Sequence, residues 1–211
     1  GSQPVGLGSL VPMIVISPLT LGGWVCSETF DHTSVLRFLE KRFGVEEPNI
    51  SAWRRAVCGD LTSAFDFAGT SDTAMPRLGV PAGSEGKAPI LVPAKQAIPR
   101  QEPGTRPARP LGYAWSVRHR LSDGASHIVF DNQGKLGAAF LVYDGLHREA
   151  PPRRYAVAAG DRLEDRWQLA KAGDAYDRRI HGPNGYLCAL RGFAEDTVEA
   201  DVRGIPGERR I

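Results

Sequence analysis

A block of four polar residues, Asp31-His32-Thr33-Ser34, precedes an apolar stretch and has the residue types for phosphate or metal chemistry. A histidine in the first turn of a helix feels the positive end of the helix dipole, which favours the neutral imidazole. A neutral imidazole can coordinate a metal ion or hydrogen-bond a phosphate oxygen beside free backbone N–H groups. The simpler interpretation is that Asp31 and Thr33 cap the helix while His32 packs beside them. Spacing alone favours this simpler interpretation.

Two other features could contact a ligand. Trp24 follows two glycines, and its ring could face a quaternary ammonium group through cation–π attraction, although an ordinary packing role explains it equally well. Arg54 and Arg55 follow Trp53 and could meet a phosphate or an acidic surface. Such a pair is more often a solvated helix face.

No complete active site can be assembled from this sequence, because it has no Ser-His-Asp order, P-loop, paired catalytic carboxylates or HExxH motif. The other histidines have no metal-ligand spacing and are expected at the surface or in turns: His119, His127, His147 and His181.

The cysteines fit neither a zinc motif nor a CxxC redox motif. Cys26 and Cys58 both lie in the first part of the chain, so a disulfide between them is one interpretation. Two buried free thiols are the other.

Composition describes an ordinary globular protein of 211 residues, with 42% hydrophobic and 24% charged residues. The net charge of +2 gives no argument for a nucleic-acid partner, and we expect none. No apolar run reaches the roughly 18 residues that a membrane span needs, so no transmembrane segment is expected. The N-terminus shows no export signal.

The first 67 residues read as part of an α/β sheet. The apolar run at residues 11–16 is bounded by prolines and is typical of a buried strand. Residues 35–43 have apolar side chains at spacings of three and four, and Gly44 is a natural C-cap, which predicts a helix. Two further short helices are expected over residues 51–57 and 61–67.

Residues 68–110 are dense in Gly, Pro, Ala and Ser. Their prolines preclude long helices, and the stretch cannot bury much apolar area. It is predicted to be a linker that runs over the surface, partly extended.

Residues 111–194 predict an all-β, immunoglobulin-like sandwich, because short alternating segments follow one another at regular spacing. Trp115 and Trp167 are expected in its core. The tail at residues 195–211 is short and charged and is expected to be poorly ordered. The predicted strands cover residues 113–121, 126–131, 138–144, 154–157, 166–169, 176–181 and 185–191.

Several blocks together resemble the bacterial phosphocholine-preferring phospholipases C, a family that also includes related acid phosphatases. In the first 67 residues these are VPMIVISP, DHTSVLRFLE and WRRAVCGDLTSAF, in the order seen at the end of that family's catalytic domain. RQEPGTRPARPLGY resembles the passage into the family's C-terminal domain, and PPRRYAVAAGDRL and HGPNGYLCALRG resemble that domain itself. The resemblance covers roughly residues 4–194.

The resemblance implies an alkaline-phosphatase-like α/β catalytic domain, of which residues 1–67 would be the C-terminal edge, followed by an accessory sandwich. It implies hydrolysis of phosphatidylcholine or sphingomyelin to phosphocholine and diacylglycerol or ceramide. The nucleophile and most metal ligands would lie upstream, so the isolated chain would be inactive. By this resemblance His32 is a catalytic candidate oriented by Asp31, and Thr33 is a substrate-contacting candidate. Trp24 is a second substrate-contacting candidate through a cation–π contact.

The resemblance also sets expectations for partners. They are choline phospholipids or a membrane surface, an upstream catalytic domain, and a secreted or periplasmic location. No cofactor or metal is expected in this chain, and a divalent metal is expected only in the full-length enzyme. A different hypothesis is a non-catalytic sandwich that binds lipid, glycan or protein. Residues 4–67 are also expected to fold poorly alone, because one strand and three short helices bury too little apolar area.

Overall fold

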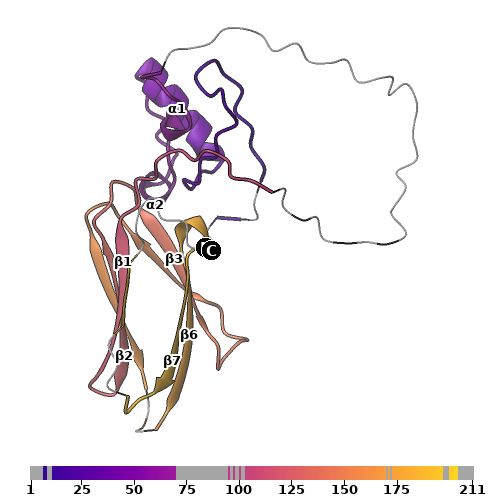
Figure 1. Cartoon of the computed structure of the whole chain (residues 1–211). Helices are drawn as coiled ribbons and strands as arrows, with labels where there is room; N and C mark the ends of the chain where they lie inside the picture. Colours follow the sequence, from indigo (N-terminus) through magenta and orange to yellow (C-terminus); the bar gives the residue numbers. More distant parts are fainter. Residues whose placement is uncertain are drawn as a thin grey trace.

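The computed structural model describes residues 7–8, 11–69, 95, 97, 100, 103–169, 171 and 173–196, and the backbone of residues 200–203. Two antiparallel sheets pack face to face, and the helices lie over one end of them (Figure 1). We refer to residues 11–69 as the N-terminal segment and to the two sheets as the sandwich.

The sandwich has strand order β5-β2-β1-β8 in one sheet and β4-β3-β6-β7 in the other. Each of the seven predicted strands is present, which confirms the β-sandwich. The strands are β1 (Trp115–Ser122), β2 (Ala125–Asn132), β3 (Ala138–Asp144), β4 (Arg153–Val157), β5 (Arg162–Gln168), β6 (Ala175–His181), β7 (Leu187–Phe193) and β8 (Ala200–Arg203).

The core lies between the two sheets and is built from alternate residues of the strands. Trp115 and Trp167 are buried in it, as predicted. Phe140 packs against Phe130 at 4.8 Å between ring centroids and meets the edge of Trp115 at 5.3 Å. Tight turns close the hairpins: Asp123 and the glycine after it both take positive φ between β1 and β2.

The expectation of a poorly ordered tail is wrong for residues 200–203. They form β8, which pairs with β1 so that Val202 lies opposite Val117. The exposed edge of β1 provides unpaired backbone groups, and a short strand satisfies them.

The N-terminal segment contains α1 (His32–Phe43), α2 (Ala52–Val57) and the 3-10 helix η1 (Thr62–Ala64). The first two helices were predicted, and the third is shorter than expected. Gly44 ends α1 in the left-handed conformation, with φ 69°. Ser51 caps α2 through its hydroxyl, which accepts from the Arg54 N–H at 3.3 Å.

The buried strand predicted at residues 11–16 is not formed among the described residues. Ile14 is 86% exposed and Ile16 is 93% exposed, and among the described residues no strand pairs with this run. A strand needs a neighbour to satisfy its backbone groups, and the described part of the chain offers none here.

The end of the expected linker returns to the N-terminal segment. Ala108 forms a parallel bridge with Val25, supported by Val25 N–H to Pro107 O and Arg109 N–H to Val25 O, each at 2.9 Å. Residues 70–94 lie outside the described residues, so the linker prediction there stays a prediction.

Among the described residues, contacts at Tyr113 and at Gly137 help to join the N-terminal segment to the sandwich. The Tyr113 hydroxyl accepts from the Thr29 N–H at 3.0 Å and lies 3.1 Å from the Thr29 hydroxyl. The other is at Gly137, where a Cβ would lie 1.9 Å from the Ala56 carbonyl oxygen of α2. The helix therefore packs on the loop before β3 because residue 137 has no side chain.

All three cysteines are free, so the Cys26–Cys58 disulfide is not formed. Cys58 and Cys188 are buried and Cys26 is partly exposed. Burial, with Asp31 nearby, raises the pKa of the Cys58 thiol to about 12, which keeps it protonated and unreactive.

Candidate functional site

The start of α1 is fixed by a capping box built from Asp31 and Ser34. Asp31 Oδ1 accepts from the Thr33 N–H at 2.9 Å and from the Thr33 hydroxyl at 2.6 Å. The Asp31 N–H donates to the Ser34 hydroxyl at 3.0 Å, and Ser34 is fully buried. These bonds satisfy backbone donors that a helix N-terminus leaves free.

Arg54 of α2 reaches the same carboxylate. Its guanidinium donates to Asp31 Oδ2, so the two helices are joined through Asp31. Burial acts to raise the pKa of the Asp31 carboxyl, but the hydrogen bonds from Thr33 and Arg54 outweigh it and hold this pKa below its ordinary value. Asp31 is therefore an anion that organises the turn around it.

His32 is exposed at the first position of α1, and within the described residues no hydrogen bond reaches its ring. The structure thus places the Asp31 carboxylate on Thr33 and Arg54, while the His32 side chain is exposed to solvent. Thr33 is half-buried and contributes to the cap. An exposed imidazole at a helix N-terminus is free to meet a phosphate or a metal that another part of the protein brings.

Trp24 lies apart from α1 and has a cationic neighbour already. The Arg109 guanidinium lies 4.6 Å from the centre of the Trp24 ring. Arg109 is buried and also lies 3.6 Å from Asp66 Oδ2. Trp24 is 44% exposed, so part of its side chain remains open to solvent beside Arg109.

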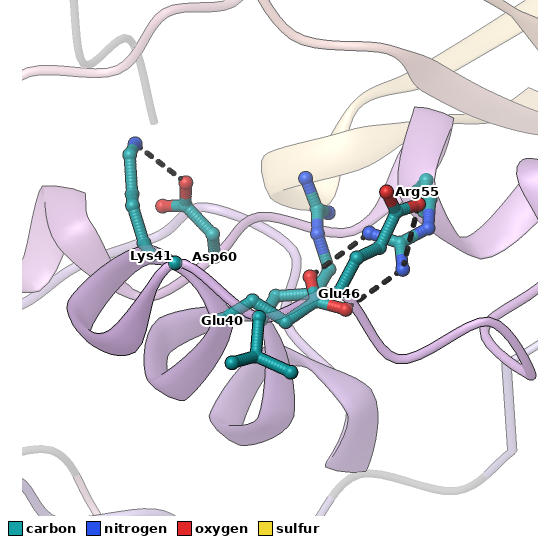
Figure 2. Close-up of a pocket in the computed structure, with 8 residues that line it drawn as sticks. Glu40, Lys41, Glu46, Arg55 and Asp60 are labelled. Atoms are coloured by element: carbon teal, nitrogen blue, oxygen red, sulfur yellow. Dashed lines mark hydrogen bonds and ion pairs between the residues drawn. The ribbon is translucent and has the colours of Figure 1, made fainter.

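A cavity of about 410 Å³ lies between α1 and the chain around α2, and its charged residues pair with one another (Figure 2). Lys41 Nζ forms an ion pair with Asp60 Oδ2 at 2.8 Å. The Arg55 guanidinium donates hydrogen bonds to both carboxylate oxygens of Glu40, at 2.8 and 2.9 Å. The hydrogen bonds from Arg55 lower the pKa of Glu40 to about 2. The lining residues are Arg37, Glu40, Lys41, Gly44, Val45, Glu46, Arg55 and Asp60.

This pairing corrects the interpretation of Arg54 and Arg55 as a solvated helix face. Each arginine binds a carboxylate of α1. The carboxylates lie 15 and 23 residues away in sequence, so no local spacing pointed to them. The cavity holds balanced, mutually satisfied charges and has no unpaired group that would act on a substrate.

Glu28 was not among the candidate residues predicted from the sequence. Burial raises the pKa of this carboxyl, although a hydrogen bond from the Ser63 hydroxyl opposes the shift. The Ser63 hydroxyl lies 3.5 Å from Cys26 Sγ. Gly59 packs against Glu28 so closely that a Cβ there would overlap the carboxylate.

Two histidines expected at the surface are buried in the sandwich. His119 Nε2 lies 2.9 Å from the Ser126 hydroxyl, and burial together with Arg178 and His127 lowers the pKa of His119. His127 Nδ1 lies 3.0 Å from Glu164. Ser126 is fully buried, so this Ser–His pair is closed to substrate and is structural. The expectation failed for two reasons: β1 turns His119 toward the core beside Val117, whereas His127 lies on the outer face of β2 and is covered by Arg120 and Glu164.

His147 and His181 are exposed, as predicted. Among the described residues, no three His, Cys, Asp or Glu side chains come together as a metal site requires. The residues described here therefore do not fit a divalent ion on their own. No helix within the described ranges has the length and apolar character to cross a membrane.

Comparisons with known proteins match both parts of the chain. Residues 107–193 match the model of the bacterial phospholipase C, C-terminal domain, and residues 1–46 match that of the phosphoesterase family. The chain is 52% identical over 202 residues to a non-hemolytic phospholipase C of Pseudomonas aeruginosa, covering 90% of this chain and 29% of that protein.

Two further relatives give the same picture. A non-hemolytic phospholipase C of Burkholderia pseudomallei is 48% identical, with 90% of this chain and 29% of that protein covered. A hemolytic phospholipase C of Pseudomonas aeruginosa is 38% identical, with 90% and 31% covered. The chain thus spans less than a third of the length of these relatives.

Proposed function

Because this chain belongs to the bacterial phospholipase C family, we propose that it is the C-terminal part of a phosphodiesterase that hydrolyses choline phospholipids. The products would be phosphocholine with diacylglycerol from phosphatidylcholine or ceramide from sphingomyelin. The observation that carries this proposal is 52% identity across 90% of the chain.

The proposal assigns residues 1–67 to the C-terminal edge of an alkaline-phosphatase-like α/β catalytic domain and residues 111–194 to an accessory domain, with residues 68–110 as the linker. The phosphoesterase match over residues 1–46 supports the first assignment, and it includes the start of α1. The match over residues 107–193 supports the second.

Phosphodiester hydrolysis needs a nucleophile in contact with phosphorus and donors for the charge that develops on the phosphoryl oxygens. Within the described residues, the paired Ser126 and His119 are enclosed in the sandwich. We therefore assign the nucleophile to the rest of the enzyme. A divalent metal, if the full-length enzyme uses one, would bind there too, and this chain would contribute no cofactor of its own.

Within this proposal His32 is the residue that meets the phosphoryl group. It is exposed at a helix N-terminus, where an imidazole N–H can donate to an anionic oxygen. Asp31 would orient His32 by fixing the turn that carries it, and Thr33 would lie beside the headgroup. The exposed part of Trp24 would contact the quaternary ammonium.

The test compares phosphocholine release from phosphatidylcholine and sphingomyelin vesicles by the 211-residue chain and by a longer chain that includes the upstream domain. We expect no turnover from the first and turnover from the second. Turnover by the 211-residue chain alone would contradict the assignment of the nucleophile. A secreted or periplasmic location, proposed with the function, is tested by fractionating cells that produce the longer chain.

A second candidate function is a non-catalytic sandwich that binds a lipid surface, a glycan or another protein. The outer face of the β4-β3-β6-β7 sheet favours it, because Tyr143 and Leu187 are exposed there beside Arg179 and Arg191. Sedimentation of the 211-residue chain with phosphatidylcholine vesicles tests the lipid form of this alternative. Binding that a Leu187→Glu substitution abolishes would support it.

A further inference from the structure

The face of α1 that packs on the rest of the N-terminal segment is largely polar, although Phe38 stacks on Phe65 at 5.0 Å between ring centroids. Ser34 is fully buried, Arg37 donates to the Cys58 carbonyl, and Lys41 pairs with Asp60. The opposite face is apolar and exposed, and at 3.6 residues per turn its side chains fall on one arc of about 100°. These exposed residues are Val35, Leu36, Leu39 and Phe43. A helix on a protein surface normally has the reverse arrangement.

The run at residues 11–16 is uncovered in the same way. Val11, Met13, Ile14 and Ile16 are all exposed, and no described strand pairs with their backbone. We call these four residues and the four on α1 the uncovered apolar residues.

The contrast with the sandwich is large. Of the seventeen large apolar side chains that are exposed among the described residues, thirteen lie in the N-terminal segment and four in the sandwich. Apolar surface of this extent on a soluble protein usually marks a contact with another surface.

From these observations we infer that the uncovered apolar residues form the surface on which the phosphoesterase part of the enzyme packs. Residues 11–16 would join its sheet as a strand, and α1 would cover its apolar face. This inference rests on the proposed function. All eight residues fall inside the phosphoesterase match over residues 1–46, and the relatives are more than three times as long as the region matched.

A lipid bilayer fits these residues less well. Hydrocarbon offers no partners for the backbone N–H and C=O groups of an extended run, whereas the edge of a sheet does. The position of His32 also favours a protein surface. His32 falls on the same arc of α1 as Val35 and Leu39, so packing of this face would carry the imidazole to the seam with the catalytic part.

The test uses a chimera in which this chain replaces the matching region of the Pseudomonas aeruginosa non-hemolytic relative. Ile14→Asp and Leu39→Asp each place a charge among the uncovered apolar residues. Leu146→Asp is the matched control, because Leu146 lies just after β3 and is 52% exposed, close to the 45% of Leu39.

In the 211-residue chain alone, all three substitutions should leave the denaturation midpoint unchanged, because each site faces solvent. In the chimera, Ile14→Asp and Leu39→Asp should lower phosphocholine release by at least about tenfold and lower the thermal midpoint, since a buried unpaired charge is strongly unfavourable. Leu146→Asp should change neither quantity. Backbone amides of residues 11–16 should exchange freely in the chain alone and become protected in the chimera.

Several results would overturn the inference. One is that Ile14→Asp and Leu39→Asp have no effect on the chimera. Another is that they lower the stability of the chimera and of the 211-residue chain equally. The third is a wild-type chimera that does not fold. Loss of vesicle binding or of self-association by the chain alone, with the chimera unaffected, would assign the surface to lipid or to a second copy. A chimera that shows amide protection but no phospholipid hydrolysis would refute the proposed function and leave the packing surface intact.

Discussion

The sandwich and the N-terminal segment are held together by different forces. In the sandwich, a cluster of buried apolar and aromatic side chains fills the space between two sheets. In the N-terminal segment, the buried apolar residues are few, namely Ile50, Val57, Cys58 and Leu61, among the described residues. Ion pairs and caps such as Arg54–Asp31 and Arg55–Glu40 hold its helices instead.

The comparison shows that the sandwich buries its own apolar side chains, whereas the N-terminal segment leaves many of its apolar side chains exposed. Apolar burial stabilises by about 25 cal/mol per Å², whereas exposed ion pairs contribute about 0–1 kcal/mol each. A segment that relies on the second kind of contact and exposes its apolar residues is expected to gain most of its stability from another domain.

The largest expected effect is truncation of a core aromatic. Phe140→Ala should destabilise the sandwich by about 3–5 kcal/mol, because it opens a cavity beside Phe130 and Trp115. Phe43→Ala in the same 211-residue chain should change stability by less than about 0.5 kcal/mol, because Phe43 is 68% exposed. Urea denaturation followed by tryptophan fluorescence measures both. Comparable losses would remove the distinction between the two regions.

The next effect concerns the contact between the regions. Gly137→Val should lift α2 from the sandwich at a cost of about 1–3 kcal/mol, because the new Cβ would overlap the Ala56 carbonyl. Gly8→Val is the control, since a Cβ there meets no atom within 4 Å. Hydrogen exchange should become faster in α2 while the β-strand amides stay protected. An unchanged exchange rate in α2 would show that the contact contributes nothing to docking.

A smaller effect is expected at the helix cap. Asp31→Ala removes the acceptor for Thr33 and leaves Arg54 without its carboxylate, so it should cost about 1–2 kcal/mol in the N-terminal segment. Glu46→Ala is the control. Its carboxylate is 79% exposed and 3.6 Å from Arg55, and such a contact contributes about 0–1 kcal/mol. Loss of helical circular dichroism at low denaturant measures both variants, and equal losses would contradict the role given to Asp31.

The sequence predicted the sandwich well because alternation along a strand is a local signal. All seven predicted strands appear, and Trp115 and Trp167 are buried as expected. The pattern did not reveal which sheet face receives a polar residue, so His119 and His127 were expected at the surface. β8 was missed because its pairing depends on the free edge of β1, which no local pattern encodes.

In the N-terminal segment the helices were predicted correctly, whereas the strand predicted at residues 11–16 is not formed. Capping residues and the spacing of apolar positions are local, so α1 and its cap at Asp31 were foreseen. Residues 11–16 have the composition of a buried strand, but a strand forms only where a neighbour pairs with it. The ion-pair partners of Arg54 and Arg55 could not be predicted either, because both contacts join residues that are far apart in the sequence.

Acid should disturb the two regions in different pH ranges. In the sandwich, the pKa of His119 is lowered by burial and by Arg178 and His127, so the unfolded state binds a proton first. Its contribution to stability is therefore lost as pH falls below about 6.5, the ordinary histidine value. In the N-terminal segment, burial opposes but hydrogen bonds from Lys41 and Thr62 lower the pKa of Asp60 to about 2. That contribution is lost only between about pH 4 and about pH 2.

Stability measured by urea titration at each pH should resolve the two steps. Tryptophan fluorescence of a Trp24→Phe, Trp53→Phe double variant reports on the sandwich, and the helix signal reports on α1. His147→Gln is the matched control, because His147 is exposed and bonded only to Asp144 Oδ2 at 2.9 Å among the described contacts, so this variant should keep the step near pH 6.5. His119→Gln should remove that step and leave the step below pH 4 unchanged. A single transition shared by both probes and both variants would mean that the regions unfold as one unit, and that the polar contacts of the N-terminal segment are coupled to the sandwich core.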